Sequence, residues 1–170
     1  MTSIMVSDKI VRIIKNKKRL EKTLNVKITN AGKEVSVAGS PENEYEAIRV
    51  LDALNIGFSF SDAISLKESE LEFDVINIRD FVRRGNIEKI RGRLIGKEGR
   101  VLAALSQLTK CSLEMKGNEI GIIGNPEDIK PAIDAITQIV QGSKHANVYK
   151  SLEKRKEEPL LDLGLKEKRK

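Results

Sequence analysis

Residues 111–142 read CSLEMKGNEIGIIGNPEDIKPAIDAITQIVQG, and this stretch decides the fold because the chain of 170 residues contains its pattern twice. A shift of 85 residues places Val26–Gly57 on Cys111–Gly142 without a gap. Three pairs of glycines coincide under this shift, namely Gly32 with Gly117, Gly39 with Gly124, and Gly57 with Gly142. Many other pairs exchange one apolar side chain for another. Chance does not preserve both features in register, so we infer two copies of one structural unit.

The second copy predicts two strands followed by a helix. Apolar and polar residues alternate over residues 111–115, as in a half-buried strand, and a glycine turn leads to a second strand at residues 120–123. Asp128 is then the expected N-cap of a helix. Apolar residues recur in that helix at helical spacing until Gly142.

Upstream of this copy, the sequence predicts one strand and two more helices. The strand covers residues 73–78, a short helix follows at Ile87–Ile95, and another helix covers residues 101–108. The order within the unit is therefore β-α-α-β-β-α. A three-stranded sheet with three helices on one face buries every apolar stripe. We predict an α+β fold with two such units in tandem.

These patterns divide the chain into four parts. The first unit is expected at residues 1–57 and the second at residues 71–143, with a linker at residues 58–70 between them. A basic helix and tail are expected at residues 144–170.

The last part predicts a short amphipathic helix docked on the second unit. Tyr149 and Leu152 form its apolar side, and Lys150 lies on a basic side that faces away from the second unit. Pro159 is expected to end the helix.

The positive charge is concentrated in two segments. The net charge is +6. Residues 83–100 hold seven basic and two acidic side chains, and residues 144–170 hold nine basic and five acidic ones. Such clustering predicts a site for a polyanion, with a solvated basic face as the open alternative.

The composition excludes several classes of function. With one cysteine, Cys111, and one histidine, His145, the chain has no disulfide framework, no multi-cysteine metal site and no pair of nucleophile and base. No apolar run approaches the roughly 18 residues of a membrane span, and residues 1–5 lack a signal-peptide pattern. We expect a cytoplasmic protein without metal, cofactor or catalysis, in which His145 packs or forms a hydrogen bond.

The chemistry lies in the segment Ile95-Gly96-Lys97-Glu98-Gly99-Arg100, between the two consecutive helices of the second unit. Two glycines three residues apart allow a sharp bend and keep side chains away from an approaching phosphate. The helix that begins at Arg100 offers unpaired N–H groups and the positive end of its dipole. The spacing of a P-loop and the third glycine of a dinucleotide fingerprint are both missing. The expected ligand is a sugar–phosphate backbone.

This loop and the residues after it resemble the core of a type I KH domain. The resemblance rests on Ile95–Gly99, Leu102, Leu105, Thr109, Cys111 and Leu113. In that family the GxxG loop clamps about four backbone nucleotides of a single strand, and the bases lie in an apolar groove beside it. Together with the basic segments, the resemblance implies RNA-binding roles for Gly96, Lys97, Glu98, Gly99, Arg100, Arg91, Arg93, Ile95, Leu113 and Lys150.

The first unit departs from the family at its loop. Ile14 lies 12 residues before Val26. In the second unit the same interval, from Ile95 to Cys111, is 16 residues. The first loop is therefore shortened and degenerate, and Lys15–Lys18 replaces GxxG. A structural or protein-binding role is expected for this unit, with phosphate contacts through the lysines as the alternative.

Two residues that follow helices are expected in the left-handed conformation. Lys110 stands where the family usually has glycine, which implies some backbone strain. Asn25 takes the same place in the first unit, and asparagine tolerates this conformation well.

The degenerate first unit, together with Arg91–Arg100 and His145–Tyr149, is similar to a narrower group: the archaeal relatives of the eukaryotic "partner of Nob" pre-ribosomal proteins. This resemblance implies a non-catalytic assembly factor that binds the 3′ region of small-subunit ribosomal RNA. The implied partners are the endonuclease that trims that end, the dimethyltransferase that modifies it, and a translation initiation factor. The alternative is a KH protein of another RNA process, such as decay or RNA chaperoning. The choice of RNA over single-stranded DNA rests on the resemblance alone.

Overall fold

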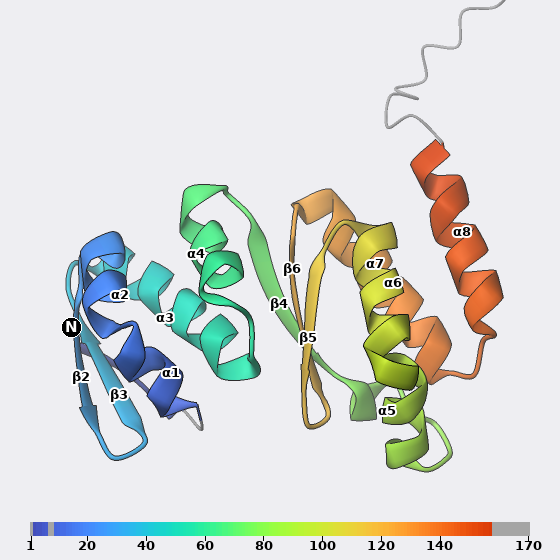
Figure 1. The fold of residues 1–170 in the computed structure, drawn as a ribbon, viewed down its shortest axis with the longest axis horizontal. Helices are drawn as coiled ribbons and strands as arrows, with labels where there is room; N and C mark the ends of the chain where they lie inside the picture. Colours follow the sequence, from blue (N-terminus) through green and yellow to red (C-terminus); the bar gives the residue numbers. More distant parts are fainter. Residues whose placement is uncertain (1, 7–8, 158–170) are drawn as a thin grey trace, which may run out of the picture.

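The chain folds into two β-sheets with layers of helices beside them (Figure 1). The structure is a computed structural model, and it describes residues 2–6 and 9–157. In chain order the elements are β1 (Thr2–Val6), α1 (Ile10–Lys15), α2 (Lys17–Leu24), β2 (Lys27–Ala31), β3 (Glu34–Ala38), α3 (Pro41–Ile56), α4 (Phe60–Glu68), β4 (Glu72–Asn77), α5 (Ile87–Ile95), α6 (Arg100–Thr109), β5 (Ser112–Lys116), β6 (Glu119–Gly124), α7 (Pro126–Val140) and α8 (His145–Glu157). Two short 3-10 turns, η1 (Ile78–Asp80) and η2 (Lys97–Gly99), precede α5 and α6.

The two halves share one topology. Both sheets are antiparallel, with the strand orders β1-β3-β2 and β4-β6-β5. Ile28 pairs with Val37 in the first sheet. Leu113 pairs with Ile122 in the second sheet, and each partner lies 85 residues further along the chain. The predicted element order and the α+β class are confirmed, and the repeat in the sequence is a repeat in the structure.

The helix ends follow the predicted turn residues with one exception. Asn25 and Lys110 are left-handed, at φ +54° and +59°, as expected. Helix α7, however, begins at Pro126, so the prediction of Asp128 as its N-cap is wrong. Proline has no N–H to satisfy and its fixed φ suits the first helical position. Asn125 therefore takes the N-cap position.

Residues 58–70, predicted to be a linker, contain helix α4. Ser59 caps this helix, because its hydroxyl oxygen accepts a hydrogen bond from the N–H of Asp62 at 3.1 Å. Ile64 and Leu66 are buried in the core of the first unit. A helix of nine residues with many polar side chains gives a weak periodic signal, and packing on α3 supplies the stability that its own sequence does not.

The second sheet lies between two layers of helices. One face packs on α6 and α7, with Ile120 and Ile122 buried there. The other face packs on α3, and Ile123 belongs to the core of the first unit. A Cβ on Gly121 would lie only 2.6 Å from Cε2 of Phe58. The two units therefore share a buried apolar contact, which the sequence pattern did not predict.

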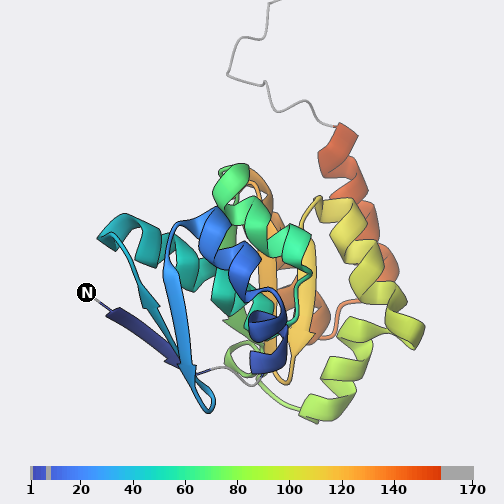
Figure 2. The same ribbon diagram turned by 60° about the vertical axis from the view of Figure 1, so that its left-hand side comes forward.

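The layers are stacked along the long axis of the molecule. The helices of the first unit lie between its own strands and the second sheet, and α5, α6 and α7 lie on the far side of that sheet (Figure 1). Figure 2, with the first unit turned forward, shows the same order.

Helix α8 packs on the outside of α6 and α7, as its apolar positions predict. Val148 and Leu152 are 1% and 7% exposed. The Nη2 atom of Arg155 donates a hydrogen bond to the carbonyl oxygen of Glu127 at 2.7 Å. The predicted docked helix is confirmed. Its predicted end at Pro159 and the rest of the tail to residue 170 lie outside the described residues.

Candidate nucleic-acid interface

The loop between α5 and α6 is a tight turn with three residues at positive φ. Gly96 lies at φ +74° and ψ 177°, Glu98 at φ +55° and ψ 28°, and Gly99 at φ +74° and ψ 14°. The N–H of Gly99 donates a hydrogen bond to the carbonyl oxygen of Gly96 at 3.3 Å, which closes the turn. Helix α6 begins at the next residue, Arg100.

The two glycines are needed for different reasons. The backbone angles of Gly96 belong to a region that is essentially restricted to glycine. A Cβ there would lie 2.3 Å from Cγ2 of Val101 and 2.8 Å from its backbone nitrogen. At Gly99 a Cβ would meet no atom within 4 Å, so its left-handed φ is the main demand on that residue. Gly96 fixes the shape of the loop, and Gly99 leaves its surface open.

The exposed side of the loop suits an anion. No side chain of the described residues caps the N-terminus of α6, so its first N–H groups and the positive end of its dipole are open to a ligand. Lys97 is exposed beside it. The Nη2 atom of Arg100 lies 3.6 Å from Oε2 of Glu98, and these side chains are 76% and 73% exposed. An ion pair this exposed contributes little, which leaves Arg100 available to a phosphate.

Arg93 has a structural role, against the sequence-based expectation that it contacts RNA. Its Nη1 atom donates a hydrogen bond to the carbonyl oxygen of Ile139 at 3.1 Å, and its Nη2 atom donates one to that of Ser143 at 2.7 Å. These carbonyl groups lie at the C-terminal end of α7, where a cation is favourable. The carbonyl oxygen of Arg93 accepts a hydrogen bond from Nε2 of His145 at 2.9 Å. The predicted hydrogen-bonding role of His145 is thereby confirmed.

The other predicted contacts differ in their accessibility. Leu113 is 8% exposed and lies in the core of the second unit, because its strand position turns it toward the helices, so it does not line an open groove as expected. Ile95 is half-buried beside the loop. Arg91 is half-buried, with its Nε atom enclosed and without a hydrogen-bond partner among the described residues. Lys150 is exposed on α8. The structure thus gathers residues 95–100 at one place and leaves Lys150 on a separate element.

Two basic residues to which the sequence assigns no individual role lie at the N-terminal end of α5, away from the loop. Arg83 and Arg84 are exposed in the bend before α5. They line a depression of about 440 Å³ together with Val140 and Gln141. Their charges contribute to the basic segment 83–100, but only the folded chain places them beside the end of α7.

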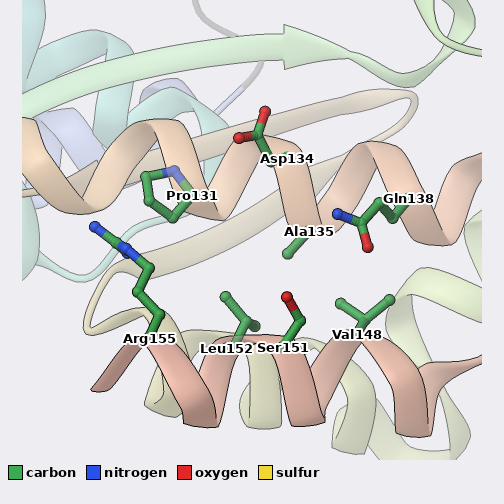
Figure 3. Close-up of a pocket in the computed structure, with 8 residues that line it drawn as sticks. All are labelled: Pro131, Asp134, Ala135, Gln138, Val148, Ser151, Leu152 and Arg155. Carbon is green, nitrogen blue, oxygen red and sulfur yellow. The ribbon is translucent and has the colours of Figure 1, made fainter. Parts of the chain in front are cut away.

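A separate depression of about 280 Å³ lies between α7 and α8 (Figure 3). Val148 and Leu152 of α8 point toward Ala135 of α7, and Asp134 and Arg155 lie at its edge. None of the predicted RNA contacts lines it. It lies on the face where α8 docks and is not a part of the loop site.

Other chemistries find little support in the described part of the chain. Burial raises the pKa of the Cys111 thiol to about 11, so the thiolate that a nucleophile needs is scarce at neutral pH. Among residues 2–6 and 9–157, no three His, Cys, Asp or Glu side chains are grouped so that they could hold a metal ion. No helix in those ranges combines the length and the apolar character that crossing a membrane requires.

Comparison with known proteins identifies the family. Residues 72–157, which include the loop and α8, match the family model for the second KH domain of PNO1, described as a eukaryotic-type KH domain (KH domain type I). The chain belongs to this family. The PNO1-type KH segment therefore covers half of the chain, and it begins at β4 and ends with α8.

Relatives of the PNO1 family extend the similarity into the first unit. The KH domain-containing protein MJ0443 of Methanocaldococcus jannaschii is 31% identical over 83% of this chain and 65% of its own length. The pre-rRNA-processing protein PNO1 of Chaetomium thermophilum is 28% identical over 60% of this chain and 41% of its own. This chain thus spans two-thirds or less of these relatives.

Two solved structures share the whole arrangement. Dim2p from Pyrococcus horikoshii is 29% identical, with a TM-score of 0.83 over 91% of this chain and 99% of that one. The complex of a/eIF2alpha, aDim2p and rRNA from the same organism contains a chain that is also 29% identical, with a TM-score of 0.83 over 92% of this chain and 94% of that one.

Proposed function

We propose that this chain binds single-stranded RNA through residues 95–100 and acts, without catalysis of its own, in the maturation of small-subunit ribosomal RNA. The observation that carries the proposal is the turn itself. Gly96 holds a glycine-only conformation, Lys97 is exposed, and no side chain caps α6. A phosphate backbone that lies across this turn meets positive charge, while the bases remain free to be read beside it.

We infer further that the first unit is a KH-type domain without a clamp. Its strand order and register repeat those of the second unit. Helix α1 ends at Lys15 and α2 begins at Lys17, so Asn16 alone separates them and no GxxG turn fits between. We place the end of this unit after α4 rather than at residue 57, because α4 belongs to its core. Its proposed role is to support the second sheet.

The proposed RNA is the 3′ region of the small-subunit ribosomal RNA. Support for ribosomal RNA comes from the Chaetomium thermophilum relative, which is named a pre-rRNA-processing protein, and from the similar chain in a complex of a/eIF2alpha, aDim2p and rRNA. The choice of the small subunit and of its 3′ region rests on the family resemblance alone. The same complex supports a translation initiation factor as a proposed partner. The endonuclease and the dimethyltransferase stay predictions, as does the cytoplasmic location. RNA decay or chaperoning remains the second candidate function, since the loop fits any single strand.

Crosslinking in cells, followed by sequencing of the bound RNA, tests the proposal. The full chain is compared with a variant that carries Lys97→Asp and Glu98→Asp. We expect reads concentrated near the 3′ end of small-subunit rRNA for the unaltered chain, and a loss of that peak in the variant. Reads spread over messenger RNAs would favour the second candidate. An unchanged rRNA peak in the variant would place the contact away from the loop.

A further inference from the structure

A second pair of available cations lies at the end of α5 opposite the loop. Arg83 and Arg84 are adjacent and exposed, and they line one depression of about 440 Å³. Val140, which is 5% exposed, and Gln141 are the other described residues of its lining. Among the residues that the structure describes, no acidic side chain lines this depression, so its described lining carries a net positive charge.

The structure gives these two arginines no other task. Within residues 2–6 and 9–157, neither Arg83 nor Arg84 has a hydrogen bond or an ion pair. Capping of α7 could have explained cations at this position. That role is already filled by Arg93, which donates to the carbonyl oxygens of Ile139 and Ser143. No described residue occupies the two guanidinium groups, so they are available to an external ligand.

The chemistry of the pair favours phosphate. A guanidinium group is planar, always charged and able to donate two parallel hydrogen bonds to a phosphate. The exposed Gln141 adds an amide donor at the same depression. Helix α5 has nine residues, so it separates the two sites by about 13 Å at a rise of 1.5 Å per residue. An RNA strand longer than the segment held in the loop can reach from one to the other.

We propose that Arg83 and Arg84 form a second phosphate-binding site, which holds the backbone of the same RNA outside the segment clamped at Gly96–Gly99. This inference rests on the proposed function. It predicts that the length of RNA needed for full affinity exceeds the roughly four nucleotides of a single KH clamp.

The dissociation constants of the full chain for two oligouridylates test the inference. One oligouridylate has about four nucleotides, the length of a single KH clamp. The other has about twelve, which is within the range of extended single-strand sites. The variant Arg83→Ala/Arg84→Ala is compared with Lys27→Ala/Lys130→Ala, which removes the same charge from exposed positions elsewhere. We expect the arginine variant to bind the longer RNA about tenfold more weakly, as for lost charge-assisted hydrogen bonds. For the longer RNA, the slope of log affinity against log salt concentration should be less steep in the arginine variant by about 1.4, or 0.7 for each of two phosphates. The shorter RNA should bind both variants like the unaltered chain.

Further controls distinguish phosphate binding at Arg83 and Arg84 from the other possible explanations. The variant Arg83→Lys/Arg84→Lys keeps the charge and should recover the salt slope, whereas a slope that stays flat would contradict phosphate binding at this site. An oligoglutamate of equal charge should bind much more weakly than RNA, and equal binding would assign the site to an acidic protein instead. Unchanged binding of the longer RNA by the alanine variant overturns this inference alone. If neither oligonucleotide binds the unaltered chain, the proposed function falls and this inference with it.

Discussion

Gly96 occupies a backbone conformation that a side chain cannot share, because a Cβ would collide with both the side chain and the backbone nitrogen of Val101. Gly99, three residues later, adopts a left-handed conformation in open space. Asparagine populates that conformation with little cost. One glycine therefore maintains the turn, and the other one only permits it.

This difference gives a prediction at the scale of single residues. Gly96→Ala should lower the free energy of unfolding by about 1–3 kcal/mol, as overpacking does, whereas Gly99→Asn should lower it by less than about 1 kcal/mol. Urea unfolding of both variants measures the difference. Equal losses in the two variants would show that Val101 moves aside and that the turn is less restrictive than described.

Residue roles at the site were predictable only in part. The GxxG spacing pointed to the turn, and the left-handed Asn25 and Lys110 followed from their positions after helices. Arg93 was different, because a count of charges cannot tell a solvent-facing guanidinium from one that bonds to carbonyl groups 46 and 50 residues away. The position of Arg83 and Arg84 could not be predicted for the same reason, because their neighbours in the depression come from the end of α7.

Among the elements, β6 lies between two helices, because α7 packs on one of its faces and α3 on the other. Its Gly121 admits the ring of Phe58, which is fully buried, at a distance that excludes any side chain. The repeat places Ser36 at the equivalent position of β3, where the side chain is half-buried and faces no second unit. The glycine thus belongs to the contact between the units and is not a general feature of the strand.

Gly121→Ala tests this contact, with Ser36→Ala as the matched control in the first copy. The added methyl group would overlap the Phe58 ring, so we expect a loss of about 1–3 kcal/mol in stability. The control removes one half-buried hydroxyl group and adds no atom, so it should change stability by no more than about 1 kcal/mol. Thermal unfolding of both variants measures these changes in stability. A stable Gly121→Ala protein would mean that the units separate easily and that the shared core is not essential.

Element types followed from periodicity, and most of them were correct. β5, β6 and α7 have regular apolar patterns. The same patterns recur 85 residues earlier in the chain, which supports the assignment independently. Helix α4 was not predicted, because its few apolar residues do not form a clear helical pattern and are buried only by packing against α3. The contact between the units was missed for a related reason. Phe58 and Gly121 are far apart in the chain, and neither stands out from its local pattern.

At the scale of the whole molecule, the shared core changes how the two halves can be compared. Removal of the first unit would expose Ile123 and the partly buried Phe73, both of which pack against its core. Weak RNA binding by residues 71–170 alone would therefore report lost folding as well as lost contacts. Substitutions in the full chain separate the two causes.

Salt dependence measures how many phosphates the full chain contacts. With Arg93 assigned to structure, Lys97, Arg100 and Arg91 remain near the loop, and three contacts give a slope of about −2 at −0.7 each. The site at Arg83 and Arg84, and the basic residues after Glu157, would make the slope steeper for longer RNA. Titrations of a short and a long single strand, with and without residues 158–170, measure these contributions. Equal slopes for all combinations would contradict additional phosphate contacts outside the loop.

The central claim is that the turn at Gly96–Gly99 holds the RNA, and the dissociation constant of the variant Lys97→Asp/Glu98→Asp tests it most directly. Both side chains are exposed, and aspartate tolerates the left-handed conformation at position 98, so the fold should be preserved. The variant places negative charge at the uncapped N-terminus of α6, where each charge changes binding by about 0.3–1 kcal/mol and up to ~2 when partly buried. With the lost lysine contact, we predict at least about tenfold weaker binding of single-stranded RNA. The control Lys130→Asp makes the same change of charge at an exposed position near the N-terminal end of α7. It should bind RNA like the unaltered chain. An unchanged dissociation constant in the loop variant would contradict the account.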